Sequence, residues 1–202
     1  MFKTILFWWG LDIKDIVYSS LCKLTNQKRI DGTHFILAIS GGMDSVTLFN
    51  ILLELKKKKS ICLSLFHVNY NMHSKSDLMH KYCVQLAKDN NIQIFTRNFN
   101  YKLFNNSNIE SKARDYRYNE IKNICLESKI KYCLTAHHQD DQIETIYMAR
   151  KNNSSWVSKI GIRVKKNLFT KDSETVDLLR PMLDISKKKI INYTKKNKLQ
   201  FL

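Results

Sequence analysis

Apolar residues recur along the chain in two patterns, as short continuous runs and as longer stretches spaced like one face of a helix. Residues 34–39 form the first continuous run, which is typical of a strand buried on both faces. Similar runs predict further strands at 61–68, 92–95 and 132–136. Helical spacing predicts helices at 15–24, 46–55, 77–90, 110–128, 140–150 and 186–196.

Strands and helices of these lengths alternate, which indicates βαβ units. The sequence therefore predicts an α/β fold with a doubly wound, mostly parallel sheet and helices on both faces. The lysines at 56–59 are expected to close the second helix as solvated charges, where cations suit the negative end of its dipole. Beyond residue 151 the pattern weakens, so 152–155 is expected to be a loop and 176–179 an edge strand.

The length of 202 residues fits one α/β domain with a short appendage. We expect an N-terminal extension over 1–30 and the domain over 31–202. The apolar start, 1–11, is shorter than the roughly 20 residues of a membrane helix, and it lacks a small-residue cleavage motif. These features predict a soluble protein with no membrane partner.

The charge balance is strongly positive, with 34 Lys and Arg against 18 Asp and Glu, or +16. Such an excess attracts polyanions, and nucleic acid is the favoured partner class. An anionic membrane surface and a coding sequence rich in lysine codons are the alternatives.

The five cysteines form no C-x-x-C pair, so neither a zinc ribbon nor an iron–sulfur site is indicated. We expect free thiols in a reducing compartment, packed as small buried hydrophobes.

The segment Ser40-Gly-Gly-Met-Asp-Ser45 joins the first predicted strand to its helix, where doubly wound sheets bind ligands. Its adjacent glycines let backbone N–H groups approach a phosphate, and the helix adds its positive end. The two serines offer hydroxyl donors, and the aspartate fits beside phosphates if it helps to hold Mg²⁺. The candidate nucleotide-binding residues are Ser40, Gly41, Gly42, Met43, Asp44 and Ser45.

A second polar segment, Thr135-Ala-His-His-Gln-Asp-Asp-Gln-Ile-Glu-Thr145, follows the predicted strand at 132–136. Its ionisable side chains could ligate a metal or transfer protons. They could also cap the next helix, through Asp140 or Asp141 with Glu144 in the first turn. Both roles are compatible, and we expect this segment to complete one pocket with residues 40–45.

These segments resemble a known family. The string 40–45 resembles the phosphate loop of the PP-loop ATP-pyrophosphatases, which split ATP between its α- and β-phosphates. It is not a Walker A loop, because the G-K-[ST] ending is missing. The string 135–145 resembles an element of the tRNA(Ile)-lysidine synthetase family, as do 67–77, 110–118 and 180–193 in the same order. Departures are Tyr70, Asn71 and His73, which replace His, Gly and Arg. The family's carboxyl-terminal domains are expected to be absent.

The resemblance implies an ATP-dependent ligase that joins lysine to carbon 2 of the wobble cytidine in the CAU anticodon of tRNA(Ile). ATP and Mg²⁺ are the implied cofactors, and free L-lysine and tRNA(Ile) are the implied partners; the oligomeric state stays open, with a homodimer as one option. Asp44 and Asp141 are expected near Mg²⁺, Arg114 near the phosphates or the adenylate, and His137 as acceptor of the lysine proton. Salt bridges of Arg114 or Arg117 to Asp115 or Glu120 are the structural alternative.

Two other functions remain open from the sequence. One is a PP-loop tRNA thiolase or an amidotransferase-type ligase, which the missing C-x-x-C pairs disfavour. The other is a non-catalytic nucleotide- or tRNA-binding descendant of the enzyme. Richness in Lys, Asn and Ile predicts a plastid-encoded protein of the chloroplast stroma, with a bacterial cytoplasm or a mitochondrion as alternatives.

Overall fold

A six-stranded sheet with the order β3-β2-β1-β4-β6-β5 organises the chain. The computed structural model describes residues 12–72, 74–100, 108–153, 156 and 158–202. All neighbouring strands pair in parallel except β5, which is antiparallel to β6. The strands are β1 (His34–Ala38), β2 (Cys62–Asn69), β3 (Gln93–Asn98), β4 (Tyr132–Leu134), β5 (Lys165–Lys171) and β6 (Glu174–Leu179).

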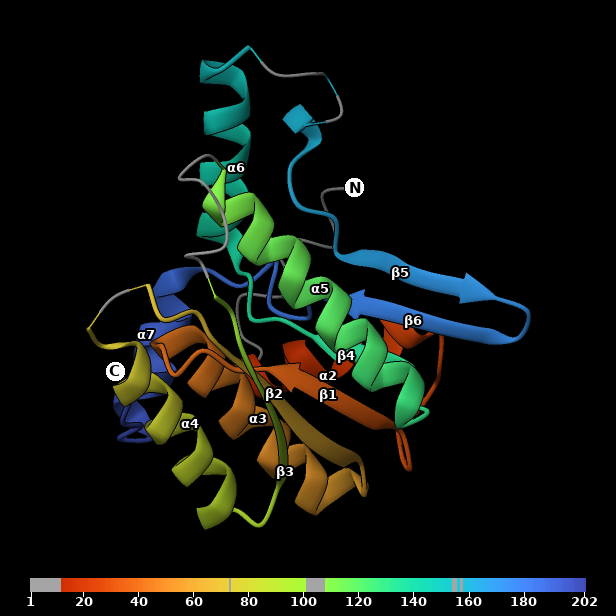
Figure 1. Ribbon diagram of the computed structural model, residues 1–202. Helices are drawn as coiled ribbons and strands as arrows, with labels where there is room; N and C mark the ends of the chain where they lie inside the picture. The colour runs from red at the N-terminus through yellow and green to blue at the C-terminus, as the bar shows by residue number, and fades with distance from the viewer. Residues whose placement is uncertain (1–11, 73, 101–107, 154–155, 157) are drawn as a thin grey trace.

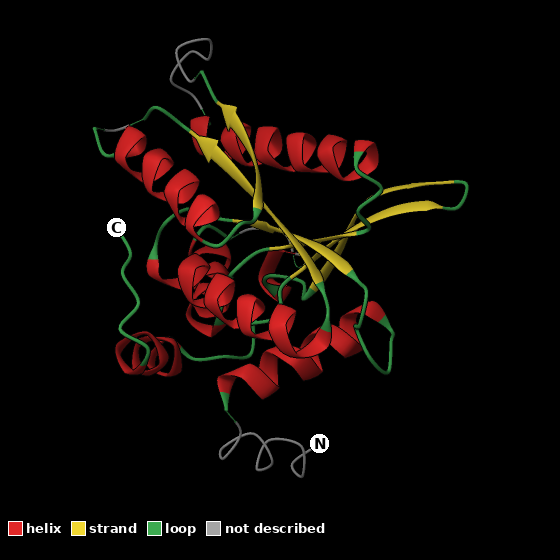
Figure 2. Cartoon of the chain, turned by 90° about the horizontal axis from the view of Figure 1, so that it is seen from below, coloured by secondary structure: helices red, strands yellow, loops and turns green. Residues whose placement is uncertain are grey.

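Helices cover both faces of this sheet (Figure 1 and Figure 2). Helices α2, α3, α4 and α7 contribute to the hydrophobic cluster on one face, and α5 contributes to the cluster on the other. None of the described helices is long and apolar enough to cross a membrane. The helices are α2 (Ile13–Thr25), α3 (Met43–Lys59), α4 (Ser76–Asp89), α5 (Ile109–Glu127), α6 (Gln139–Lys151) and α7 (Lys187–Lys196), with the 3₁₀ turn η2 (Ser158–Ile160).

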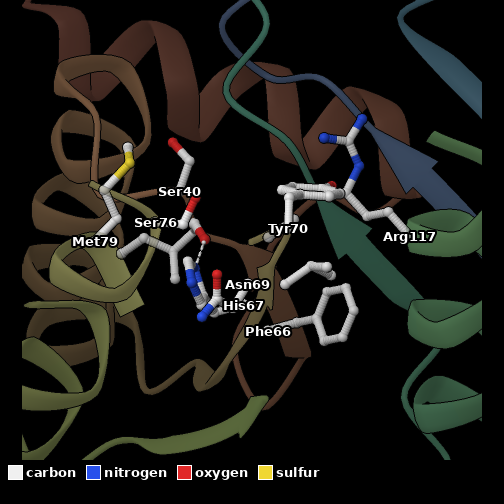
Figure 3. A pocket seen from close by; sticks show the side chains of 11 residues that line it. Ser40, Phe66, His67, Asn69, Tyr70, Ser76, Met79 and Arg117 are labelled. Atoms are coloured by element: carbon white, nitrogen blue, oxygen red, sulfur yellow. Dashed lines mark hydrogen bonds between the residues drawn. The ribbon is translucent and has the colours of Figure 1, made fainter. Parts of the chain in front are cut away.

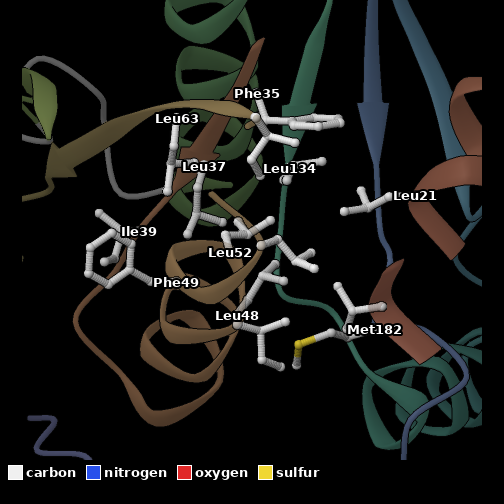
Figure 4. Packing of buried hydrophobic residues seen from close by; sticks show 14 of the residues in the cluster. Leu21, Phe35, Leu37, Ile39, Leu48, Phe49, Leu52, Leu63, Leu134 and Met182 are labelled. Carbon is white, nitrogen blue, oxygen red and sulfur yellow. The ribbon is translucent and has the colours of Figure 1, made fainter. Parts of the chain in front are cut away.

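Strand β1 shows how the sequence pattern builds two cores. Phe35 and Leu37 belong to the cluster with α2, α3 and α7, whereas Ile36 between them belongs to the opposite cluster. All three are fully buried, because successive side chains of a strand point to opposite faces and both faces are covered. Figure 4 shows Leu48 and Leu52 of α3 packed on the first of these faces.

The structure confirms the predicted fold class, and every predicted strand and helix is present with shifted ends. One prediction is wrong, because β6, expected as an edge strand at 176–179, lies between β4 and β5. The true edge strand, β5, was missed. None of its residues is buried, so it has little of the hydrophobic periodicity that reveals a strand.

Helix α2 packs into the same core as the sheet. Its residues Ile16, Val17 and Leu21 are buried in the cluster that α3 and α7 also line. The helix begins after Asp12, whose side chain accepts the Lys14 N–H. The predicted boundary between an extension and the domain at residue 31 therefore falls after a helix that shares the domain's core.

All five cysteines are free thiols, as expected. Cys83, Cys125 and Cys133 are buried, and burial raises the pKa of the Cys83 thiol to about 12. Cys62, at the start of β2, is exposed instead. The expectation of buried packing therefore holds for three of these side chains and is wrong for Cys62.

Candidate functional site

The two polar segments singled out in the sequence lie side by side. Strands β1 and β4 are parallel neighbours, with Phe35 opposite Tyr132, so their carboxyl ends meet at one edge of the sheet. The chain crosses from β1 to β2 on one side, while β4 lies on the other. This edge is therefore the switch point of the doubly wound sheet, where such folds bind ligands.

The loop after β1 leads into α3 without a side-chain cap for the N–H groups of the helix. Gly41 adopts a left-handed φ of +88°, and Cys83 Sγ lies 3.4 Å from where a Cβ would stand. The Ser45 hydroxyl accepts the Ser40 N–H at 3.2 Å and donates to the Gly42 carbonyl at 2.9 Å. Gly42 caps α3 without a side-chain hydrogen bond. The first-turn N–H groups and the helix dipole can therefore receive an anion.

A distant segment braces this phosphate loop. The Leu202 N–H donates to the Gly41 carbonyl at 3.0 Å. The Tyr82 hydroxyl of α4 donates to the Gln200 carbonyl at 2.6 Å. These bonds hold residues 200–202 against both the loop and α4. The conformation of the loop is therefore stabilised by a segment that is distant in sequence.

Asp44 lies at the centre of a charged cluster. Its carboxylate accepts a hydrogen bond from the ammonium group of Lys187, at the start of α7. Asp44 Oδ2 lies 3.6 Å from Nε2 of His138, and Asp141 Oδ2 lies 3.7 Å from the same nitrogen. His138 thus connects the two carboxylates that the sequence predicts as metal ligands. The structure joins residues 40–45 and 135–145 at this point.

Helix α6 begins with a capping box that differs from the predicted one. Instead of Asp140 or Asp141 with Glu144, the N-cap is His138. Its Nδ1 accepts the Asp140 N–H at 3.2 Å, and the Asp141 carboxylate accepts the His138 N–H at 2.8 Å. Because Nδ1 is an acceptor, the proton of the neutral ring lies on Nε2, which faces Asp44 and Asp141.

His137 lies among arginines rather than carboxylates. Its Nδ1 is 2.9 Å from the Thr135 hydroxyl. Burial, followed by the positive charges of Arg180, Arg117 and Arg114, lowers the pKa of His137 to about 3. A general base works best when its pKa is near the operating pH. The predicted role of His137 as proton acceptor therefore lacks support, and the arginines around it favour a bound anion.

The predicted salt bridges of the α5 arginines do not form within the described residues. Glu120, one expected partner of Arg117, instead accepts a hydrogen bond from Arg97 Nε at 2.7 Å. Arg117 Nε is buried and has no hydrogen-bond partner in the described part of the chain. Arg117, which also lines the cavity described below, therefore has one buried donor that is unpaired among the described residues.

A cavity of about 150 Å³ opens beside the phosphate loop, between the carboxyl ends of β1 and β2. Ser40, His67, Asn69 and Arg117 supply polar groups to its wall (Figure 3). The buried His67 donates from Nδ1 to the Ile39 carbonyl at 2.9 Å, and its Nε2 has no partner among described atoms. Burial lowers the pKa of His67, so this Nε2 is an unpaired acceptor. The cavity wall therefore combines apolar and polar groups, as small-molecule pockets do.

Comparison with protein families agrees with this geometry. A model described as the PP-loop domain matches residues 14–202, a range that contains the phosphate loop, the Asp44 cluster and the cavity. The chain belongs to the PP-loop family. The hypothesis drawn from the string at 40–45 is thereby confirmed.

Curated relatives of this PP-loop domain include the tRNA(Ile)-lysidine synthase of Buchnera aphidicola from Acyrthosiphon pisum. It is 33% identical over 168 residues, which cover 83% of this chain and 36% of the relative. The tRNA(Ile)-lysidine synthase of Streptococcus mutans is 31% identical over 191 residues, covering 88% of this chain and 40% of the relative. The PP-loop domain therefore spans less than half the length of these relatives.

Solved structures share the fold at low sequence identity. The U34-tRNA thiolase NcsA from Methanococcus maripaludis, solved with its [4Fe-4S] cluster, has a TM-score of 0.72 and 17% identity, covering 94% of this chain and 64% of that one. The glutamine-dependent NAD+ synthetase from Acinetobacter baumannii has a TM-score of 0.56 and 11% identity, covering 90% and 31%. At these identities the likeness establishes the fold alone.

The side chains of the PP-loop site suit a magnesium ion held jointly with a nucleotide. The described residues contain no group of three or more His, Cys, Asp or Glu side chains that could hold a metal ion without other ligands. Mg²⁺ in nucleotide enzymes takes one or two protein carboxylates and completes its shell with phosphates and water. Asp44 and Asp141, which face the same His138 nitrogen, provide such a pair.

Sequence reasoning missed part of the PP-loop site. Lys187 is one residue that sequence analysis does not predict. Three lysines begin α7, although cations are unfavourable at the positive end of a helix dipole. This unfavourable placement could have indicated that one of them has a functional role. Arg180 is the first residue of the segment 180–193, and the sequence assigns it no role of its own. It is buried, and it donates to the Arg163 carbonyl at 2.6 Å. His67 gave no separate signal, because only the fold places it in the cavity wall.

Proposed function

We propose that this PP-loop domain activates the wobble cytidine of tRNA(Ile) with ATP and ligates lysine to it. The chain resembles tRNA(Ile)-lysidine synthases from two bacteria over more than four fifths of its length. The observation that carries the proposal is the meeting of Asp44 and Asp141 at His138, beside the uncapped start of α3. This places metal-compatible carboxylates next to an anion site.

In the proposed reaction, ATP binds with its phosphates at the loop and its base in the adjoining cavity. The 2-carbonyl oxygen of the cytidine attacks the α-phosphorus, and the bond to the β-phosphate oxygen breaks to release pyrophosphate. The ε-amine of lysine then bonds to carbon 2, the C–O bond to the adenylate breaks, and AMP leaves. Mg²⁺, when bound, neutralises phosphate charge.

Each group of the site has a defined part in this proposal. The α3 N–H groups and Lys187 bind phosphate oxygens, because both are positive and lie beside Asp44. Arg114 and Arg117 stabilise negative charge on the departing adenylate. His137, neutral at pH 7 because its pKa is about 3, orients a reacting group through hydrogen bonds. Water takes up the lysine proton.

Lysine incorporation tests the proposal directly. Purified chain is incubated with ATP, Mg²⁺, radiolabelled lysine and tRNA(Ile) that has a CAU anticodon, and label in the RNA is counted. A tRNA with a GAU anticodon is the control. We expect label only with the CAU tRNA, together with one AMP and one pyrophosphate for each lysine.

Two other outcomes would contradict the proposal in different ways. Adenylation that proceeds to a sulfur-containing base when sulfide replaces lysine would indicate a thiolase, the activity named for the NcsA structure. Saturable ATP and tRNA binding without pyrophosphate release would indicate a non-catalytic binding protein.

A further inference from the structure

Helix α6 presents large apolar side chains to solvent where a folded chain would normally bury them. Ile143 is 61% exposed, Tyr147 66% and Met148 52%. Ile143 and Tyr147 lie four residues apart and so share one face of the helix. Figure 1 shows α6 extending away from the sheet, with η2 beside it. The exposed face is therefore not part of either core.

The segment after α6 adds further exposed apolar side chains and is fixed to the helix. Trp156 is 74% exposed and Ile160 is 54% exposed. The Ile162 N–H donates to the side-chain oxygen of Gln142 in α6. Gly161 has a φ of +87°, and a Cβ there would lie 2.7 Å from that oxygen. Glycine at this position thus lets residues 161–162 approach the helix closely.

The charge around this surface is mainly positive, although Glu144 of α6 is also exposed. Residues 145–170 contain six Lys and Arg and no Asp or Glu. Arg150 and Lys151, at the end of α6, are both exposed. Two copies of such a surface would repel each other, whereas a polyanion would be attracted. Exposed aromatic side chains beside cations are the features that bind unpaired nucleic-acid bases and their phosphates.

The surface also leads to the reaction site. Asp141, in the first turn of α6, belongs to the Asp44 cluster. Tyr147 follows six residues later, about 9 Å farther along the helix axis at 1.5 Å per residue. That distance corresponds to roughly three stacked bases at about 3.4 Å each. Asp141 and Tyr147 project about a third of a turn apart around the helix, so an RNA strand that joins the reaction site to Tyr147 crosses the surface of α6 rather than following one face.

We propose that Tyr147 and Trp156 stack unpaired bases of an RNA loop, with Arg150 and Lys151 contacting its phosphates. These four residues form what we call the RNA-stacking face. The identity of its RNA ligand rests on the proposed function. It adds a place where the bases next to the reacting cytidine are held. RNA loops suit such recognition because their bases are already unstacked.

Hairpin binding without ATP or lysine tests the RNA-stacking face. Fluorescence anisotropy measures the Kd for a labelled hairpin with a seven-base CAU loop, and for a duplex of equal length. We expect Tyr147→Ala with Trp156→Ala to weaken hairpin binding at least tenfold and to leave duplex binding unchanged. Tyr147→Phe should retain the wild-type Kd, because the ring stays.

A matched control is Tyr18→Ala in α2, where Lys59 Nζ lies 5.0 Å from the ring centroid. It removes a partly exposed tyrosine beside a lysine on the far side of the domain, and we expect an unchanged hairpin Kd. Arg150→Gln should lower the slope of log K against log salt by about one, as loss of one phosphate contact does.

Two results would overturn the RNA-stacking face. One is a wild-type hairpin Kd in the double variant, confirmed as folded by circular dichroism. The other is self-association of the wild type that the double variant loses in mass photometry, since that would make the surface a contact between copies. A protein that binds hairpins through Tyr147 and Trp156 but incorporates no lysine would refute only the proposed function.

Discussion

Replacing Asp44 with asparagine separates the chemistry of the site from the stability of the fold. The Asp44 and Lys187 side chains are 31% and 32% exposed, so solvent screens their ion pair and its loss should cost about 0.5–1 kcal/mol. The same change removes a carboxylate from the proposed metal position. Loss of one electrostatic group at a developing charge slows catalysis about 10²–10³-fold, or 3–4 kcal/mol. We therefore expect a large loss of rate with a small loss of stability.

The assay measures pyrophosphate release in the presence of ATP, Mg²⁺, lysine and tRNA(Ile), with urea unfolding of the same samples. Asp31→Asn is the control, because Asp31 pairs with Arg29 at 3.1 Å just before the amino end of β1, opposite the site. It should keep the wild-type rate. An Asp44→Asn protein that releases pyrophosphate at the wild-type rate would refute the assignment. A rate loss matched by loss of folded protein would refute the separation of the two effects.

Three further predictions follow from the structure. Gly41→Ala and Gly32→Ala both force alanine into a left-handed φ. Each should lower the free energy of unfolding in urea by about 1 kcal/mol or more. Only Gly41→Ala should also weaken ATP binding, measured by calorimetry. The pKa of His137 is about 3 in the folded protein and near 6.5 in the unfolded chain. Between these pH values the unfolded state binds more protons, so the free energy of unfolding falls as the pH drops from about 6.5 to 3. His137→Gln should reduce that fall by up to about 1.4 kcal/mol per pH unit. Equal slopes of unfolding free energy against pH in the two proteins would contradict the prediction. Leu37→Ala, at a fully buried site, should cost about 2–5 kcal/mol in urea unfolding.

The sequence predicts those parts of the molecule whose neighbours in space are neighbours in the chain. The run at 34–39 is apolar at every position after its histidine, and such a run has few alternatives to a buried strand. The loop that follows has a local shape set by its own glycines and serines. No residue of the edge strand β5 is buried. Its pairing with β6 is therefore a tertiary contact that leaves little hydrophobic periodicity in the sequence.

The same limit applies to the candidate site. His137 and His138 are adjacent, and the sequence offers no way to tell which one faces Asp44. The choice depends on the extended backbone of His138, with φ of −129° and ψ of −176° at the helix N-cap. The contact between Lys187 and Asp44 joins residues 143 positions apart. Only the completed packing of α7 against α3 places that ammonium group at the loop.

The bond from the Leu202 N–H to the Gly41 carbonyl has a consequence for protein synthesis. The ribosome makes Gly41 long before Leu202, so a nascent chain has the loop but not yet the segment that braces it. We expect a stalled chain that exposes only residues 1–170 to bind ATP weakly. Nucleotide capture is then expected to begin only after residues 200–202 have been made and have left the exit tunnel.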